Sequence, residues 1–117
     1  MASIPAIARR GAVAAALALT AVAGADAADD DASQMALGKT LFTAGAVPPC
    51  AICHALKDAG ATGAVGPALD DLQPDAERVI AALKNGIGAM PSYRSSLSDE
   101  QMRALARYVA KASGAAR

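Results

Sequence analysis

The chain has very few aromatic side chains. Its 117 residues contain no Trp, one Phe (Phe42) and two Tyr (Tyr93 and Tyr108). Aromatic rings usually contribute much of the buried area of a core, and a small domain without them has only a marginal core. We therefore expect something other than aromatic side chains to fill the interior of this protein.

The chain also lacks an excess of charge of either sign. Eleven Lys and Arg residues balance eleven Asp and Glu residues over the full sequence. From Ala28 onward, nine basic and ten acidic residues leave a net side-chain charge of −1. With no basic surplus, the composition gives no indication of nucleic-acid binding. The sequence also shows no convincing strand pattern, no internal repeat and no second domain.

Cysteine and histidine are scarce and are confined to one place. Both cysteines and the single histidine lie in the segment Cys50-Ala51-Ile52-Cys53-His54. The spacing Cys-x-x-Cys-His is the one that attaches a c-type haem, with two thiols as covalent tethers and the imidazole as an iron ligand. We therefore predict one haem c, bound through Cys50 and Cys53, with His54 on the iron.

Three other kinds of site use cysteines at this spacing. A thioredoxin-like redox pair follows a strand in a βαβ unit, and no β-branched alternating run precedes Cys50. A structural zinc site needs four ligands, and this segment offers three. A plain structural disulfide would leave His54 without a role.

The N-terminal residues have the pattern of a secretory signal peptide. Arg9 and Arg10 precede an apolar run over residues 11–23, and a small-x-small site ends at Ala27. The alternative is a retained membrane anchor, but an apolar run of about 13 residues is short of the roughly 20 that span a bilayer. We predict a signal peptide over residues 1–27, a single domain over residues 28–117 with no membrane span, and a periplasmic location. An exported protein also meets the oxidising conditions in which paired cysteines are common.

Helical periodicity and end signals predict three principal helices. The first covers residues 33–44, with a polar leader of three aspartates before it, and the second covers residues 74–85, with Pro74 at its first position. The third begins at Ser98, which forms a capping box with Gln101. The first helix contains Gly38 in its middle, which usually marks a close approach by another backbone.

The second ligand of the iron has to be something other than histidine. Met90 lies in a glycine-rich segment that breaks the helical pattern and ends at Pro91, whereas Met35 and Met102 lie on apolar helical faces. A thioether in an irregular loop can reach a metal that a helix could not present it to. We predict His54 and Met90 as the metal ligands.

A metal-bound imidazole normally donates its other N–H to a fixed acceptor. The rigid corner Gly66-Pro67 could present such a backbone carbonyl to His54. It could also be an ordinary turn, and the residues alone leave both readings open.

Taken together, these residues resemble class I c-type cytochromes over essentially the whole of residues 28–117. The resemblance implies an all-α fold, with about three principal helices wrapped around one covalently attached haem. It implies that Gly38 and Phe42 cross the last helix at Leu105 and Tyr108. It also implies that the carbonyl of Pro67 orients His54, and that Met90 with Pro91 forms the distal ligand motif.

A narrower resemblance concerns residues 58–75 and 85–93. These segments are similar to the small cytochrome subunit of periplasmic sulfite dehydrogenases, whose partner subunit carries a molybdenum cofactor. The resemblance leaves two alternatives open, a freely diffusing carrier of single electrons and a haem-bearing relay subunit of such a complex. A haem enzyme or gas sensor would need Met90 to leave the iron. Arg94 and Tyr93 are minor candidates for contacts with the haem propionates.

Overall fold

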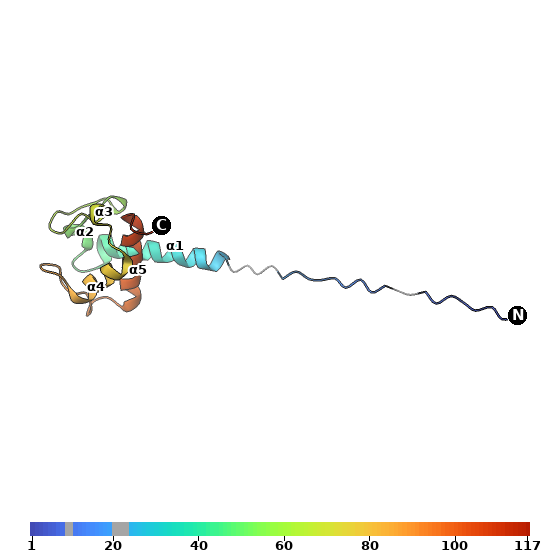
Figure 1. Ribbon diagram of the computed structural model, residues 1–117. Helices are drawn as coiled ribbons and strands as arrows, with labels where there is room; N and C mark the ends of the chain where they lie inside the picture. The colour runs from blue at the N-terminus through green and yellow to red at the C-terminus, as the bar shows by residue number, and fades with distance from the viewer. Residues whose placement is uncertain (9–10, 20–23) are drawn as a thin grey trace.

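The computed structural model describes residues 1–8, 11–19 and 24–117, and its folded part is helical (Figure 1). The helices are α1 Gly24–Thr40, α2 Cys50–Cys53, α3 Leu69–Leu72, α4 Ala76–Asn85 and α5 Asp99–Ala112, with the π-helical turn η1 Leu41–Gly45 and the 3-10 turn η2 Lys57–Ala59. The predicted Arg9-Arg10 pair and residues 20–23 of the predicted apolar run lie outside the described residues. The predicted all-α class and its three principal helices are confirmed.

The helix pair α1 and α5 forms the main crossing of the fold, and α4 packs on α5 beside it (Figure 1). Gly38 is buried at the crossing, where an added Cβ would overlap the Ala104 carbonyl oxygen and the Tyr108 Cβ. Phe42 meets Tyr108 edge to face, with ring centroids 6.0 Å apart. The mid-helix glycine therefore has the packing role that the sequence indicated, because a side chain there would push the two helices apart.

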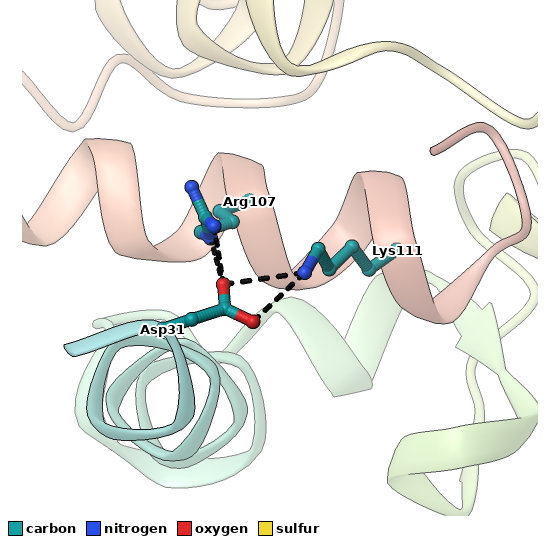
Figure 2. Close-up of polar contacts among 3 residues, drawn as sticks. All are labelled: Asp31, Arg107 and Lys111. Atoms are coloured by element: carbon teal, nitrogen blue, oxygen red, sulfur yellow. Dashed lines mark hydrogen bonds and ion pairs between the residues drawn. The ribbon is translucent and has the colours of Figure 1, made fainter. Parts of the chain in front are cut away.

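Helix α1 starts earlier than predicted. The three aspartates expected to form a solvated leader lie inside α1, and Asp31 accepts hydrogen bonds from both Arg107 and Lys111 of α5. Figure 2 shows the two cationic side chains reaching the same carboxylate. Asp31 lies seven residues, about two turns, before Gly38, so both residues face α5. The predicted leader was therefore wrong: the three aspartates are helical, and Asp31 pairs with a distant helix, which no local pattern indicates.

The second and third principal helices begin close to where the sequence predicted. Helix α4 begins at Ala76, two residues later than predicted, because Asp75 caps it and accepts a 2.8 Å hydrogen bond from the Arg78 N–H. The capping box of α5 is complete, with Ser98 and Gln101 each bonding the other's backbone N–H. The two caps therefore fix where α4 and α5 begin.

A small hairpin follows His54. The sequence pattern did not indicate this hairpin. Strands β1 Ala55–Leu56 and β2 Ala61–Thr62 pair antiparallel, and Gly60 supplies a left-handed turn at φ 61°. The hairpin is fastened to the main crossing, since the Tyr108 hydroxyl donates a 2.6 Å hydrogen bond to Asp58. Two-residue strands are too short to show an alternating pattern, so they could not be read from the sequence.

None of the helices in the described part of the chain is long and apolar enough to cross a membrane.

Candidate functional site

A cavity of about 440 Å³ lies between the loops and the inner faces of α4 and α5. All five residues that the sequence singled out line this cavity: Cys50, Cys53, His54, Pro67 and Met90. Its remaining wall is mainly apolar and includes Phe42, Leu69, Leu72, Val79, Leu83, Leu105 and Val109. The structure therefore brings these five residues, which lie up to 40 positions apart in the sequence, around one hydrophobic space.

The two cysteines lie on the single helical turn α2, which begins after the extended Pro49. Both are free and half-buried, and both face the cavity. Burial raises the pKa of the Cys50 thiol to about 11. A thiol that stays protonated at neutral pH is a poor nucleophile, so Cys50 lacks the reactive thiolate that a redox pair needs.

His54 leaves α2 in an extended conformation, and a hydrogen bond to Pro67 holds its ring. Its Nδ1 lies 2.8 Å from the Pro67 carbonyl oxygen. A carbonyl can only accept, so Nδ1 carries the proton and donates it in this hydrogen bond. The tautomer that results leaves a lone pair on Nε2, which is the form of imidazole that binds a metal.

Two glycines let the segment before Pro67 lie directly on α2 and His54. A Cβ on Gly66 would come within 2.5 Å of the His54 Cε1, and one on Gly63 within 2.5 Å of the Ile52 carbonyl oxygen. The Gly66 N–H also donates a 2.8 Å hydrogen bond to the Cys53 carbonyl. The absence of side chains at these positions therefore sets how closely Pro67 approaches the imidazole.

Met90 is presented by a tight turn directly after α4. Ile87 and Met90 exchange two backbone hydrogen bonds, of 3.1 and 2.9 Å, and Gly88 within the turn has a left-handed φ of 56°. The Met90 side chain is half-buried at the cavity. Met102 is buried in the core and Met35 packs against it, so among the described methionines only Met90 lines the cavity.

Two polar residues also line the cavity: Tyr93, which the sequence offered as a candidate, and Arg78, which sequence reasoning missed. Tyr93 lines the cavity, but its hydroxyl donates a 2.6 Å hydrogen bond to the Pro48 carbonyl, and burial raises the pKa of its phenol to about 12. Arg78 lines the cavity where Arg94 does not. Its position four residues before Ala82, on the cavity face of α4, is the signal that could have identified it.

The cavity suits a covalently attached haem. Its lining contains two thiols at the attachment spacing, an imidazole with a free Nε2 and a thioether, all around an apolar space. These groups suit a haem c, because thiols can tether the porphyrin and an imidazole and a thioether can bind its iron. Arg78 adds a cationic side chain at the wall, which suits a carboxylate group. Within the described ranges, no group of three or more His, Cys, Asp and Glu side chains is arranged to hold a metal ion.

Comparisons with known proteins agree with this geometry. Residues 33–109 match the family described as cytochrome C oxidase, cbb3-type, subunit III. The chain is 30% identical to cytochrome c-551 of Halorhodospira halochloris over 73 residues, which are 62% of this chain and 92% of that protein. It is 33% identical to cytochrome c6 of Synechocystis sp. over 86 residues, covering 67% of this chain and 65% of that protein.

The fold is also similar to a solved structure. The crystal structure of the c-type cytochrome SorU from Sinorhizobium meliloti superposes with a TM-score of 0.69 at 49% identity, over 71% of this chain and 94% of that chain. The likeness is therefore shared by sequence and by fold, and it covers most of the helical part. The chain belongs to the class I c-type cytochrome family, whose members carry haem c and transfer electrons.

Proposed function

We propose that this protein is an exported, single-haem cytochrome that carries one electron at a time through a haem ligated by His54 and Met90. The observation that carries the proposal is that Cys50, Cys53, His54 and Met90 all line one apolar cavity. In this proposal the cysteines tether the group and Pro67 orients His54 through the Nδ1 hydrogen bond. A bound haem supplies an iron centre that gains and loses single electrons reversibly.

The residues around the iron would set its reduction potential. The thioether of Met90 is a soft donor, which favours the reduced metal and raises the potential relative to a harder ligand. The apolar wall keeps water away, and Arg78 is the residue we assign to a haem propionate. The two backbone hydrogen bonds that hold the turn of Met90 support a carrier over an enzyme or gas sensor, because those functions need this ligand to leave.

Covalent attachment is tested by extraction. We expect acidified organic solvent to leave the haem with the denatured polypeptide, since thioether bonds survive unfolding. The double variant Cys50→Ala/Cys53→Ala, loaded with haem in vitro, serves as the control that releases it. Release of all haem from the wild-type protein, or a Cys50–Cys53 disulfide in its mass spectrum, would refute the tether.

The iron ligand is tested by Met90→Ala. We expect this variant to lower the reduction potential and to bind cyanide and carbon monoxide rapidly, because the iron gains an open position. Met102→Leu is the matched control, because Met102 is buried away from the cavity. It should lower the free energy of unfolding by less than about 1.5 kcal/mol. An unchanged potential and spectrum in Met90→Ala would rule out this ligand.

Export is tested separately from the haem. The predicted signal peptide over residues 1–27 should be removed, so the protein recovered from the periplasm should begin at Ala28. The observed helix α1 begins at Gly24 and includes this position, so cleavage would remove only the start of the helix. Recovery of the uncleaved chain from the membrane fraction would favour the retained anchor instead.

A second function is a relay subunit of a molybdenum enzyme that oxidises sulfite. It is favoured by the resemblance of residues 85–93 to the small subunits of such complexes, and by the rim of the cavity. Val65 and Ile87 line the cavity yet remain 74% and 68% exposed, as apolar residues do where a partner covers them. A net side-chain charge near −1 would steer a diffusing partner only weakly.

Co-expression with the candidate molybdenum subunit distinguishes the two functions. A relay subunit should co-elute with its partner and be reduced on addition of sulfite, with little dependence on salt. A protein that elutes alone, and whose reduction slows steeply as salt is added, is a diffusing carrier.

A further inference from the structure

Tyr93 connects two segments of the cavity that are distant in the sequence. It lies three residues after Met90, and its hydroxyl donates a 2.6 Å hydrogen bond to the carbonyl of Pro48, two residues before Cys50. The side chain is only 4% exposed, and Tyr93, Pro48, Cys50 and Met90 all line the cavity. One hydrogen bond therefore joins the loop that carries Met90 to the segment that carries the first tether.

The backbone of Tyr93 is itself fixed at both ends. Its N–H donates a 2.7 Å hydrogen bond to the Leu83 carbonyl in α4, and its carbonyl accepts a 2.9 Å hydrogen bond from the Leu97 N–H before α5. Residues 86–92 thus form a loop whose two ends are anchored on α4. Because the main chain of Tyr93 cannot shift freely, its side chain holds Pro48 at a set distance from the loop.

Breaking the hydrogen bond between Tyr93 and Pro48 costs free energy. A buried hydroxyl or carbonyl that loses its partner is left unsatisfied away from water. Separation of the Met90 loop from the tether segment would break this bond and leave the hydroxyl of Tyr93, a residue only 4% exposed, without its partner. The link therefore opposes the movement that would carry Met90 away from the wall that holds Cys50.

We propose that Tyr93 is a positioning residue that holds the Met90 loop against the tether segment and so keeps Met90 on the iron. This inference rests on the proposed ligation by His54 and Met90. Tyr93 acts through the Pro48 carbonyl and does not itself ligate the metal. Its aromatic ring fills space, whereas its hydroxyl group sets the ligand in place.

The test compares two tyrosines in the haem-loaded protein. Tyr93→Phe keeps the ring and removes the hydrogen bond to Pro48. Tyr108→Phe is the matched control, because Tyr108 is also buried and donates a 2.6 Å hydrogen bond, but to Asp58 and away from the cavity. Met90→Ala provides the fully open site, and the denaturation midpoint is measured for every variant.

The readout is the rate at which cyanide binds the oxidised protein, together with the absorption band of the Met–iron bond. Tyr93→Phe should bind cyanide roughly two- to tenfold faster than wild type, the factor expected for the loss of one hydrogen bond that opposes opening. Tyr108→Phe should bind at the wild-type rate, even where it loses as much stability. Equal acceleration in the two variants would assign the effect to general loosening and overturn the inference.

The remaining outcomes separate this inference from the proposed ligation. A wild-type cyanide rate in Tyr93→Phe, beside a fast rate in Met90→Ala, overturns the role of Tyr93 and leaves the ligation intact. A wild-type rate in Met90→Ala itself overturns the ligation, and the role of Tyr93 with it.

A measurement on the wild-type protein applies even if Tyr93→Phe does not fold. Coupling is reciprocal, so displacement of Met90 by cyanide should speed the exchange of the Tyr93 hydroxyl proton, seen by NMR, and leave that of Tyr108 unchanged. Exchange at Tyr93 that cyanide does not alter would overturn the inference.

Discussion

The crossing of α1 and α5 and the loops around the cavity solve different packing problems. At the crossing, Gly38 of α1 lies directly against Ala104 and Tyr108 of α5, so protein atoms complete that half of the core. Around the cavity, the walls surround a space of about 440 Å³, and Val65 and Ile87 remain exposed at its rim. The difference indicates that protein side chains alone pack the crossing, whereas the cavity half needs its cofactor to be packed.

The two regions also differ in how they hold polar groups. At the crossing, side chains pair with side chains, as Asp31 does with Lys111 (Figure 2). Around the cavity, side chains bond to backbone carbonyls, His54 to Pro67 and Tyr93 to Pro48. A backbone acceptor moves only when the chain moves, which suits groups that have to keep a fixed geometry around a metal.

The largest effect is expected when the cavity half loses its cofactor. The double variant Cys50→Ala/Cys53→Ala should lose attached haem and several kcal/mol of stability, which is on the order of the whole stability of a small domain. Helix content by circular dichroism, measured through a denaturant titration, checks this expectation. A variant that keeps the wild-type midpoint would show that the crossing supports the fold without the cofactor, and that the contrast drawn between the two regions is wrong.

The second-largest effect is expected from a substitution of Gly38 at the crossing. Gly38→Ala should cost about 2–3 kcal/mol, because the new methyl group meets the backbone of α5 and the Cβ of Tyr108, which cannot move aside. The reduction potential should stay unchanged, since Gly38 does not line the cavity. Leu37→Ala, at the partly exposed neighbouring position, is the control and should cost less. A shifted potential in Gly38→Ala would contradict the independence of the two regions.

A glycine in the cavity half should give the opposite pattern. Gly66→Ala places a methyl group 2.5 Å from the His54 Cε1, and the imidazole can turn away from it, so we expect a smaller cost of about 1–2 kcal/mol. The potential and the haem spectrum should change, because His54 can no longer reach Pro67. Ala64→Ser, at a nearby exposed position that does not line the cavity, should leave both unaltered. A wild-type spectrum in Gly66→Ala would refute the control of His54 by this contact.

The smallest effect is expected at the ion pairs of the crossing. Hydrogen bonds from Lys111 and Arg107 hold the pKa of Asp31 below its ordinary value of 3.8. The resulting stabilisation is present above that ordinary value and is lost as the pH falls through the lower pKa of the folded state. Asp31→Asn should therefore lower the midpoint of unfolding slightly at neutral pH and low salt, and not at all in strong acid.

High salt should shrink this difference as well, because the ion pairs are partly exposed. Asp30→Asn, at the exposed preceding position, is the control. A difference between Asp31→Asn and wild type that persists unchanged in acid and in salt would show that the ion pairs are not its cause.

The sequence by itself determined the features that depend on neighbouring residues. The attachment motif from Cys50 to His54 is read from spacing alone, and the start of α5 follows from Ser98 and Gln101, because capping groups act on backbone amides three residues away. Gly38 was marked as a contact by its cost inside a helix. The assignment of Met90 rested on its irregular loop, and the structure brings it to the same cavity as the attachment motif.

Only the tertiary structure decided which distant groups meet. The pairing of Asp31 with Lys111 spans 80 residues and that of Tyr93 with Pro48 spans 45, so both depend on how elements cross and not on any local pattern. The presence of Arg78 at the cavity, where Arg94 had been considered, depends in the same way on the rotation of α4. Periodicity and caps specify each helix because their interactions are local. The contacts between elements, which hold His54 and Tyr93 in place, are fixed by long-range packing.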